Sequence, residues 1–235
     1  KIEHPAILEV CDFLETRGFE VSRIGVNAEG FVDPEAVQNA IRSDTILISI
    51  MLANNEVGTL QAIREIAKIS HEKNILCHTD AAQAAGKIEI DVAELGVDML
   101  SIAGHKLNAP KGVGALYLRN GVELPPLMFG GGHEKGLRPG TENVLEIVGL
   151  GAAAARFSQN SEMIIAETKI LRDCFENLLE ERVPAIRFNG PRENRLPNTA
   201  SISFEGVKVD DLLFRCKGFA ASGGAACHID GDTPS

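Results

Sequence analysis

The feature that most restricts the fold is an alternation, through the first 120 residues, of short apolar runs with amphipathic segments. Strands are expected at residues 19–24, 45–53, 75–79, 98–102 and 115–118. Helical spacing of apolar residues predicts helices over residues 5–17, 34–42 and 63–73. Strands that are apolar throughout are buried on both faces, so the pattern predicts a largely parallel sheet flanked by helices.

The second part of the chain follows a glycine-rich stretch at residues 130–140. It is expected to contain a mostly helical segment, two strands and a further helix, at residues 141–179, 186–189, 200–204 and 209–216. These elements predict an α/β fold with a large domain over residues 1–160 and part of a smaller domain over residues 161–235. Because the sequence opens on Lys and ends in a loop-like run, we expect a fragment of a longer protein.

The composition is that of a globular protein, with 44% hydrophobic and 24% charged residues. A net charge of −10 argues against a nucleic-acid partner, because such surfaces need clustered Lys and Arg. The longest mainly apolar stretch, residues 46–53, is far shorter than the ~20 residues of a membrane span. Five cysteines without a C-x-x-C spacing indicate neither a disulfide framework nor a zinc ribbon. We therefore expect a soluble, cytoplasmic protein with no membrane partner.

Three of the expected strands run into polar residues, at Asn54-Asn55-Glu56, at Asp80 and Gln83, and at Gly104-His105-Lys106. Each group alone is as well explained by caps and turns, which favour Asn and Asp. Together they fall at the carboxyl edge of one predicted sheet, which is where open α/β sheets bind ligands.

Lys106 and Asp80 suit the chemistry of pyridoxal phosphate. This cofactor needs a lysine that forms a Schiff base with it and an acid that keeps its ring nitrogen protonated. Lys106 follows one strand and Asp80 a neighbouring one, so the pair can face a single ring. The alternative, a solvated surface lysine, does not account for the flanking Gly104 and His105.

The polar motifs resemble those of the cysteine desulfurase and selenocysteine lyase family, and the similarity covers nearly the whole chain. They are Ala-Asn-Asn-Glu-Val-Gly (53–58), His-Thr-Asp-Ala-Ala-Gln (78–83), Gly-His-Lys (104–106), Arg-Pro-Gly-Thr-Glu-Asn (138–143) and Gly-Gly-Ala-Ala-Cys-His (223–228). The ending, together with the runs at 51–56 and 129–132, is most similar to the selenocysteine lyase branch. The resemblance implies an aminotransferase-like homodimer of fold type I that binds pyridoxal 5'-phosphate.

Carried over, Lys106 would be the Schiff-base lysine and proton shuttle, and Asp80 would pair with the ring nitrogen. Gln83 would lie at the phenolic oxygen, and Asn55 would contact cofactor or substrate at the ring edge. His4 would stack on the ring face. From the residues alone, His4 is only a helix cap or a surface residue.

The resemblance also implies that His105 binds the cofactor phosphate and that Thr141 joins it from the partner subunit. Cys227 would act on the active-site loop, either taking sulfur as a persulfide or assisting selenium release. Its setting after Ser222, Gly223 and Gly224 suits a reactive thiolate. The other four cysteines are interpreted as small buried hydrophobic residues.

The sequence departs from the family pattern at two places. Ala103 stands where many cysteine desulfurases have a phosphate-binding Ser, which again favours the selenocysteine lyase branch. The family's Gly-Thr phosphate loop would precede Lys1 and its substrate-carboxylate Arg would follow Ser235. This chain by itself is therefore expected to hold cofactor and substrate weakly.

The expected reaction is removal of selenium or sulfur from L-selenocysteine or L-cysteine, which leaves L-alanine. A cysteine desulfurase that passes sulfur to an acceptor protein, for iron–sulfur clusters or thiolation, is the nearest alternative. An aminotransferase would have no use for Cys227. From another class, an inactive fragment could act only as a dimerisation or binding module. Metal hydrolase and nucleotide-binding motifs are absent from the sequence.

Overall fold

The computed structural model describes residues 1–224, and every structural statement below refers to them. Its helices are α1 Pro5–Thr16, α2 Pro34–Ala40, α3 Ile63–Glu72, α4 Val92–Leu95, α5 Val144–Arg182 and α6 Val209–Arg215, with the 3-10 turns η1 Gly104–Leu107 and η2 Glu134–Gly136. Its strands are β1 Leu47–Ser49, β2 Leu76–Asp80, β3 Met99–Ala103, β4 Gly114–Leu118, β5 Ile186–Asn189 and β6 Ser201–Phe204.

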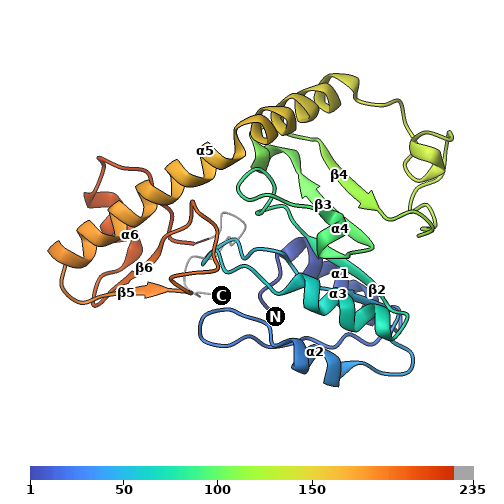
Figure 1. Cartoon of the computed structure of the whole chain (residues 1–235), viewed down its shortest axis with the longest axis horizontal. Helices are drawn as coiled ribbons and strands as arrows, with labels where there is room; N and C mark the ends of the chain where they lie inside the picture. The colour runs from blue at the N-terminus through green and yellow to red at the C-terminus, as the bar shows by residue number, and fades with distance from the viewer. Residues whose placement is uncertain (225–235) are drawn as a thin grey trace.

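The larger sheet has the order β1-β2-β3-β4 (Figure 1). The first three strands are parallel, and β4 pairs antiparallel with β3. The predicted α/β fold with a mostly parallel sheet is confirmed. A separate antiparallel pair, β5 and β6, lies at the other end of the molecule, along the second half of α5 (Figure 1).

The core lies between this sheet and α3. Helix α3 buries Ile63, Ile66 and Ala67 completely or nearly so, against sheet residues that include Ile48 and Leu100. The other face of the sheet is polar, because Ser49 pairs with His78 and Asp80 with Ser101 in the register. Residues paired in this way point to the same side of a sheet, so one face forms the core and the opposite face carries polar groups.

One predicted strand is wrong. Residues 19–24 form no strand, although Phe19, Val21 and Ile24 are apolar. Among the described residues no strand pairs with it, and Phe19 is half exposed, so there is no ladder to define a strand. An isolated bridge between Val26 and Val32 follows instead.

The other predicted elements are present with shifted ends. Strand β1 is shorter than the predicted 45–53, but Ile50 and Leu52 still donate their N–H groups to His78 and Asp80. The chain therefore stays extended beside β2 up to the polar loop. The four-residue helix α4, between Asp91 and Gly96, was not predicted.

Asp98 connects four elements of the first part of the chain. It is fully buried and accepts hydrogen bonds from the Cys77 backbone (2.7 Å), from His71 (3.1 Å) and from Arg119 (2.6 Å). Burial alone would raise the pKa of this carboxyl, but the three donors outweigh it, and the pKa is lowered. The charge on Asp98 therefore helps to tie α3, β2, β3 and the residue after β4 together.

The long helix α5 bends at Asn160, whose φ of −131° and ψ of 15° are not helical. Directly after the bend, Ser161 donates to Glu89 at 2.7 Å, which fixes α5 to the loop after β2. The predicted domain boundary near residue 160 stays a prediction. The bend in α5 lies at that position, but Leu196, which comes after the boundary, packs in the core of the first part of the chain.

Residues 194–196 lie against residues 58–60, which follow the polar loop at the end of β1. Leu60 donates its N–H to Asn194 and Leu196 donates to Gly58, both at 2.8 Å. An antiparallel bridge joins Thr59 to Arg195. We call residues 194–196 the strap, because they fasten the second part of the chain to this loop.

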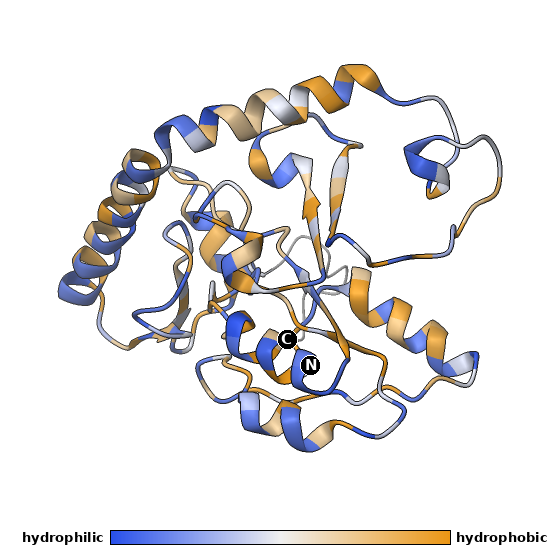
Figure 2. Ribbon diagram, turned by 45° about the vertical axis from the view of Figure 1, so that its right-hand side comes forward, coloured by the Kyte–Doolittle hydropathy of each residue, from blue (hydrophilic) through white to orange (hydrophobic). Residues whose placement is uncertain are grey.

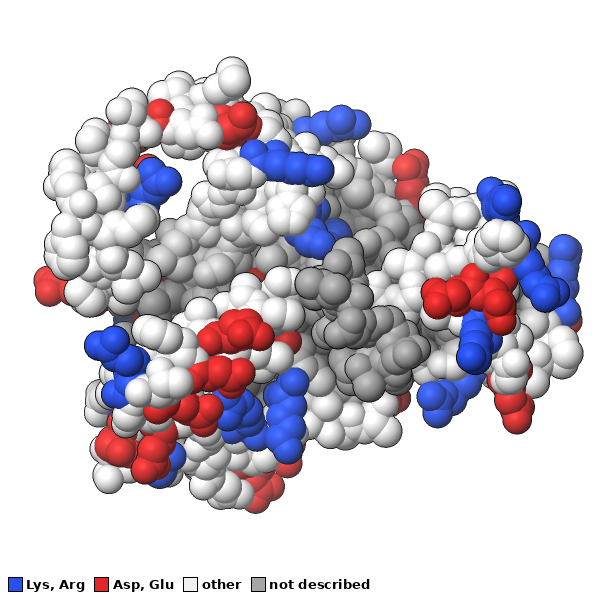
Figure 3. Space-filling model, turned by 180° about the vertical axis from the view of Figure 1, so that it is seen from behind, with Lys and Arg blue, Asp and Glu red and all other residues white. Residues whose placement is uncertain are grey.

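The surface combines mixed charge with a large apolar area. On the face in Figure 3, acidic and basic side chains are interspersed rather than gathered in one basic patch. The first half of α5 is largely apolar around its surface (Figure 2), and Leu145 there is 80% exposed. Leu127 and Phe129, on the loop that projects before α5, are exposed by 93% and 88%. Among the described residues, no helix has the length and apolar character needed to cross a membrane.

Candidate functional site

The candidate site lies at the carboxyl ends of β2 and β3, where β3 passes directly into η1. Gly104 opens this turn, and a Cβ there would come within 2.8 Å of the carbonyl oxygen of Val113. The Gly104 N–H donates to that same carbonyl at 2.9 Å. Buried Leu107 anchors the other end. A glycine is therefore needed to seat η1 so closely against the start of β4.

Lys106 and His105 project from this turn into solvent. Both side chains are exposed, and neither forms a hydrogen bond or ion pair with another described residue. The packing of η1 depends on Gly104 and Leu107, so the two polar side chains are available to a ligand. Both were predicted as site residues, and the fold places both at the edge of the sheet.

Asp80 ends β2, beside β3, in register with Ser101. Its Oδ1 accepts from the Ala82 N–H at 2.8 Å, which turns the chain and leaves Oδ2 without a hydrogen bond to a described residue. The half-buried Asp80 thus offers one carboxylate oxygen to a cationic group.

Glu3 lies close to Asp80 and was missed by the sequence analysis. Its Oε1 accepts from the Met51 N–H at 2.7 Å, while its Oε2 is buried without a partner among the described residues. Burial, with a smaller contribution from the charge of Asp80 and against the opposing hydrogen bond from Met51, raises the pKa of Glu3 to about 7. Two carboxyl groups therefore face this edge, and the Glu3 group keeps its proton to a higher pH than an ordinary glutamate does.

Glu3 predicts a specific pH dependence of stability. Its folded pKa of about 7 exceeds the ordinary 4.5, so its contribution to stability is complete below pH 4.5 and is lost as the pH rises through 7. Between these values the free energy of unfolding should fall by about 3 kcal/mol relative to Glu3→Gln. Urea unfolding of both proteins across this range measures the difference. Glu9→Gln, at an exposed position of α1, is the control, and parallel curves for Glu3→Gln and wild type would refute the prediction.

The two asparagines after β1 have different tasks. Asn54 is buried, and its Oδ1 accepts from the N–H groups of Glu56 and Val57, at 2.9 and 3.0 Å. Its Nδ2 donates to the Ile2 carbonyl at 3.3 Å. Asn54 therefore shapes the turn, which is the alternative to ligand binding that the sequence left open for these polar residues. Asn55, the predicted site residue, makes no side-chain hydrogen bond with a described residue and is half exposed.

His4 caps helix α1. Its Nδ1 accepts from the Ala6 N–H at 3.1 Å, so a neutral His4 carries its proton on Nε2. The cap role expected from the residues alone is present. Since Glu3 is tied to Met51 beside Asp80, the neighbouring His4 also lies near the sheet edge. Its predicted stacking on a cofactor ring stays a prediction.

Gln83 lies on the turn after β2, and its side-chain oxygen accepts from Lys87 Nζ at 2.7 Å. Lys87 was not singled out from the sequence, because nothing in its spacing marks it. Burial, with a smaller contribution from the positive charge of Lys106, lowers the pKa of Lys87 to about 8. This coupling places Gln83, Lys87 and Lys106 in one neighbourhood.

A hydrogen-bonded row crosses the polar face of the sheet beneath these groups. His78 Nδ1 lies 2.8 Å from Ser49 Oγ, and His78 Nε2 lies 2.9 Å from Ser101 Oγ. Burial lowers the pKa of His78, against the opposing effect of Asp80, which favours a neutral ring. The sequence analysis did not predict this row of Ser49, His78 and Ser101. The position of His78, two residues before Asp80 and so on the same face of the strand, could have indicated it.

Two predicted site residues are not gathered here. Thr141 is exposed and lies just before α5, on the segment after β4 that projects from the body (Figure 1), and its side chain forms no hydrogen bond with a described residue of this edge. Cys227 lies outside the described residues. The predicted roles of both residues stay predictions.

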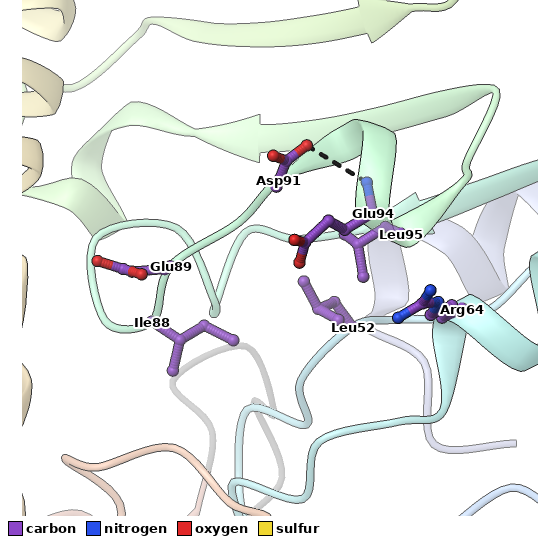
Figure 4. Close-up of a pocket in the computed structure, with 7 residues that line it drawn as sticks. All are labelled: Leu52, Arg64, Ile88, Glu89, Asp91, Glu94 and Leu95. Atoms are coloured by element: carbon purple, nitrogen blue, oxygen red, sulfur yellow. Dashed lines mark hydrogen bonds between the residues drawn. The ribbon is translucent and has the colours of Figure 1, made fainter.

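A cleft of about 160 Å³ lies elsewhere, between α4 and the start of α3 (Figure 4). Its polar lining includes Arg64, Glu89 and Glu94, and Asp91 is occupied in capping α4. None of the predicted site residues lines it. The cleft is therefore separate from the sheet-edge site.

The sequence of this chain is similar to those of known proteins along nearly all of its length. Residues 1–230 match the aminotransferase class-V family. The cysteine desulfurase IscS of Dictyoglomus turgidum is 47% identical over 237 residues, and the match covers all of this chain and 60% of that protein. The cysteine desulfurase NifS of Azotobacter vinelandii is 44% identical over 236 residues, with 59% of it covered.

Solved structures agree with the fold. A NifS-like protein superposes with a TM-score of 0.88 at 39% identity, and the match covers 92% of this chain and 60% of that one. SspA in complex with cysteine gives a TM-score of 0.80 at 40% identity, covering 96% and 62%. The chain thus spans about 60% of the length of these relatives.

Proposed function

Because the chain belongs to the aminotransferase class-V family, whose members use pyridoxal 5'-phosphate, we propose that its protein removes sulfur from L-cysteine to leave L-alanine. The same groups would accept L-selenocysteine. The observation that carries this proposal is that Asp80 and Lys106 follow the carboxyl ends of the adjacent parallel strands β2 and β3, with Gln83 on the turn after β2. The relatives named as cysteine desulfurases, and the cysteine-bound SspA, support the choice of substrate.

The donor set at the sheet edge fits the cofactor. An aldehyde needs an accessible amine, and Lys106 is exposed without a partner in the described chain. A ring nitrogen that carries a proton needs a carboxylate, and Asp80 retains one free oxygen there. Gln83 and His105 supply donors for the ring oxygen and the phosphate. Ala103 adds no hydroxyl group at the end of β3.

Each residue then has a defined task. When bound, pyridoxal phosphate supplies an electron sink for the carbanion character that develops beside the amino group. Asp80 maintains the ring proton, and Lys106 takes the α-proton from the substrate and returns a proton later. Cys227 attacks the substrate sulfur, so an S–S bond forms as the carbon–sulfur bond breaks. The products are L-alanine and a persulfide on Cys227.

The cofactor site is tested by the absorbance spectrum of the purified protein after addition of pyridoxal phosphate. We expect a visible band that is lost in Lys106→Ala. Borohydride reduction should fix the cofactor on the peptide that carries Lys106, as shown by mass spectrometry. A band that persists unchanged in Lys106→Ala would remove Lys106 from this role. No band in either protein would favour the binding-module alternative.

The choice between sulfur and selenium is tested with Cys227→Ala. We expect this variant to lose at least about tenfold in L-alanine formation from L-cysteine, because the thiolate that accepts the sulfur is gone. Formation from L-selenocysteine should fall much less, since a selenol leaves more readily. Cys174→Ala is the control, because this thiol on α5 is exposed, contrary to the expectation that it would be buried. Equal losses with both substrates would show that Cys227 does not discriminate between them.

The remaining assignments are parts of the same proposal. A homodimer is supported by the exposed apolar side chains of Leu127, Phe129 and Leu145, since an apolar area of this kind marks an interaction surface. In such a dimer, Thr141 would serve the partner's site. We further propose that the persulfide is passed to an acceptor protein and that the protein is cytoplasmic. The residues after about 160 would form part of a smaller domain.

A further inference from the structure

Lys87 is held more firmly than a surface lysine. Its Nζ donates to the Gln83 main-chain carbonyl at 2.8 Å and to the Gln83 side-chain Oε1 at 2.7 Å. The side chain is partly buried, and burial is the main cause of its lowered pKa. Ordering and burying an ammonium group carries a free-energy cost, so the double contact calls for a reason.

The contact fixes which way the Gln83 amide points. An ammonium group can only donate hydrogen bonds, so the amide atom that faces it must be the oxygen. The Nε2 group is then directed away from Lys87, and it donates to no described residue. Gln83 therefore presents a donor, which suits a ligand with an acceptor or anionic oxygen.

The turn that carries Lys87 is packed directly against η1. Gly86 has a φ of +77°, and a Cβ on it would lie 2.1 Å from Leu107 Cδ1 and 3.4 Å from Leu107 Cα. Only glycine allows this approach. Leu107 follows Lys106, so the close packing accounts for the influence of the Lys106 charge on Lys87. The turn that carries Gln83 and Lys87 therefore packs against the turn that carries Lys106.

We propose that Lys87 is a positioning residue of the cofactor site, which locks the Gln83 amide so that its NH₂ group faces the ligand. The inference rests on the proposed function, because the ligand oxygen in question is that of pyridoxal phosphate. Lys87 itself does not touch the reacting atoms. Its effect on the cofactor passes through Gln83, and this route can be separated from a general effect on stability.

A double-mutant cycle tests the route, with pyridoxal phosphate as the probe and its dissociation constant measured from the visible band. Lys87→Met should weaken binding about tenfold, because the amide can then turn its oxygen toward an acceptor. Gln83→Ala should weaken it to a similar extent. The double variant should bind no more than about twofold worse than Gln83→Ala alone, since both changes remove one interaction.

Two further variants complete the design. Lys87→Arg retains a cationic donor and should restore binding to within about threefold of wild type. Lys68→Met, at an exposed position of α3, is the matched control and should leave binding unchanged. Thermal unfolding of the cofactor-free variants is recorded in parallel, because a merely structural role would lower the unfolding temperature whether or not Gln83 is present.

The outcomes separate the two proposals. A wild-type band with fully additive losses in the double variant overturns the role of Lys87 and leaves the proposed function standing. If Lys87→Met binds pyridoxal phosphate as tightly as the wild type does, the role of Lys87 is likewise overturned and the proposed function is unaffected. Absence of a Lys106-dependent band in the wild-type protein overturns the cofactor site and the role of Lys87 with it.

Discussion

Replacing Lys106 with alanine should reduce L-alanine formation from L-cysteine by at least about 10³-fold. The loss is large because one amine serves both as the covalent attachment point and as the carrier of the α-proton, and the two losses combine. The fold should be unaffected, since η1 is seated through Gly104 and Leu107 while the Lys106 side chain is exposed. Steady-state assays give the turnover, and thermal unfolding shows whether the protein is intact.

Lys111→Ala provides the comparison, because Lys111 is an exposed lysine on the turn that leads to β4. It should retain the turnover of the wild type. Full turnover in Lys106→Ala would exclude the Schiff-base assignment, whatever the state of the fold.

The second large effect concerns stability. Glu176→Gln should lower the free energy of unfolding by about 3–5 kcal/mol, because it leaves the buried guanidinium of Arg195 without its counter-charge. The Glu176 carboxylate is 2% exposed and receives both terminal nitrogens of Arg195, at 2.7 and 2.5 Å. Arg192 adds a third contact at 3.2 Å. Urea unfolding measures the loss without the screening that guanidinium salts would introduce.

Glu180→Gln is the matched control, one turn further along α5. Its partner is again Arg192, at 3.0 Å, but both side chains are largely exposed. Pairs of this kind contribute about 0–1 kcal/mol, so this variant should unfold almost as the wild type does. Equal losses in the two variants would show that burial of the Glu176–Arg195 pair has no special weight.

The sheet and the polar residues at its carboxyl edge were predictable because their signals are local. Apolar runs of strand length marked β1 to β4, and each polar group follows its run within a few residues. The prediction at residues 19–24 depended on Phe19, Val21 and Ile24, but the segment forms no strand, because apolar residues do not reveal whether a partner strand lies beside them. Helix α4 carries a capping Asp91 and a closing Gly96, but four residues are too few to show a period.

The finer arrangement of the site could not be read from spacing. Asn54 and Asn55 are adjacent and chemically identical, yet Asn54 is buried in shaping the turn and Asn55 remains available. Glu3 and Lys87 owe their character to burial and to neighbours on other elements, which a single sequence does not show. The pair between Glu176 and Arg195 joins a helix to a distant loop, so it too depended on the three-dimensional fold.

The strap also sets an order of events during synthesis. The loop that carries Asn55 is closed at residues 58–60 by hydrogen bonds to Asn194 and Leu196, which leave the ribosome much later. Contacts between such distant segments form slowly, since the intervening chain must first be ordered. The nascent sheet can therefore assemble early with Asp80 and Lys106 in place. The loop that carries Asn55 becomes fixed only when residue 196 arrives and Leu196 enters the core.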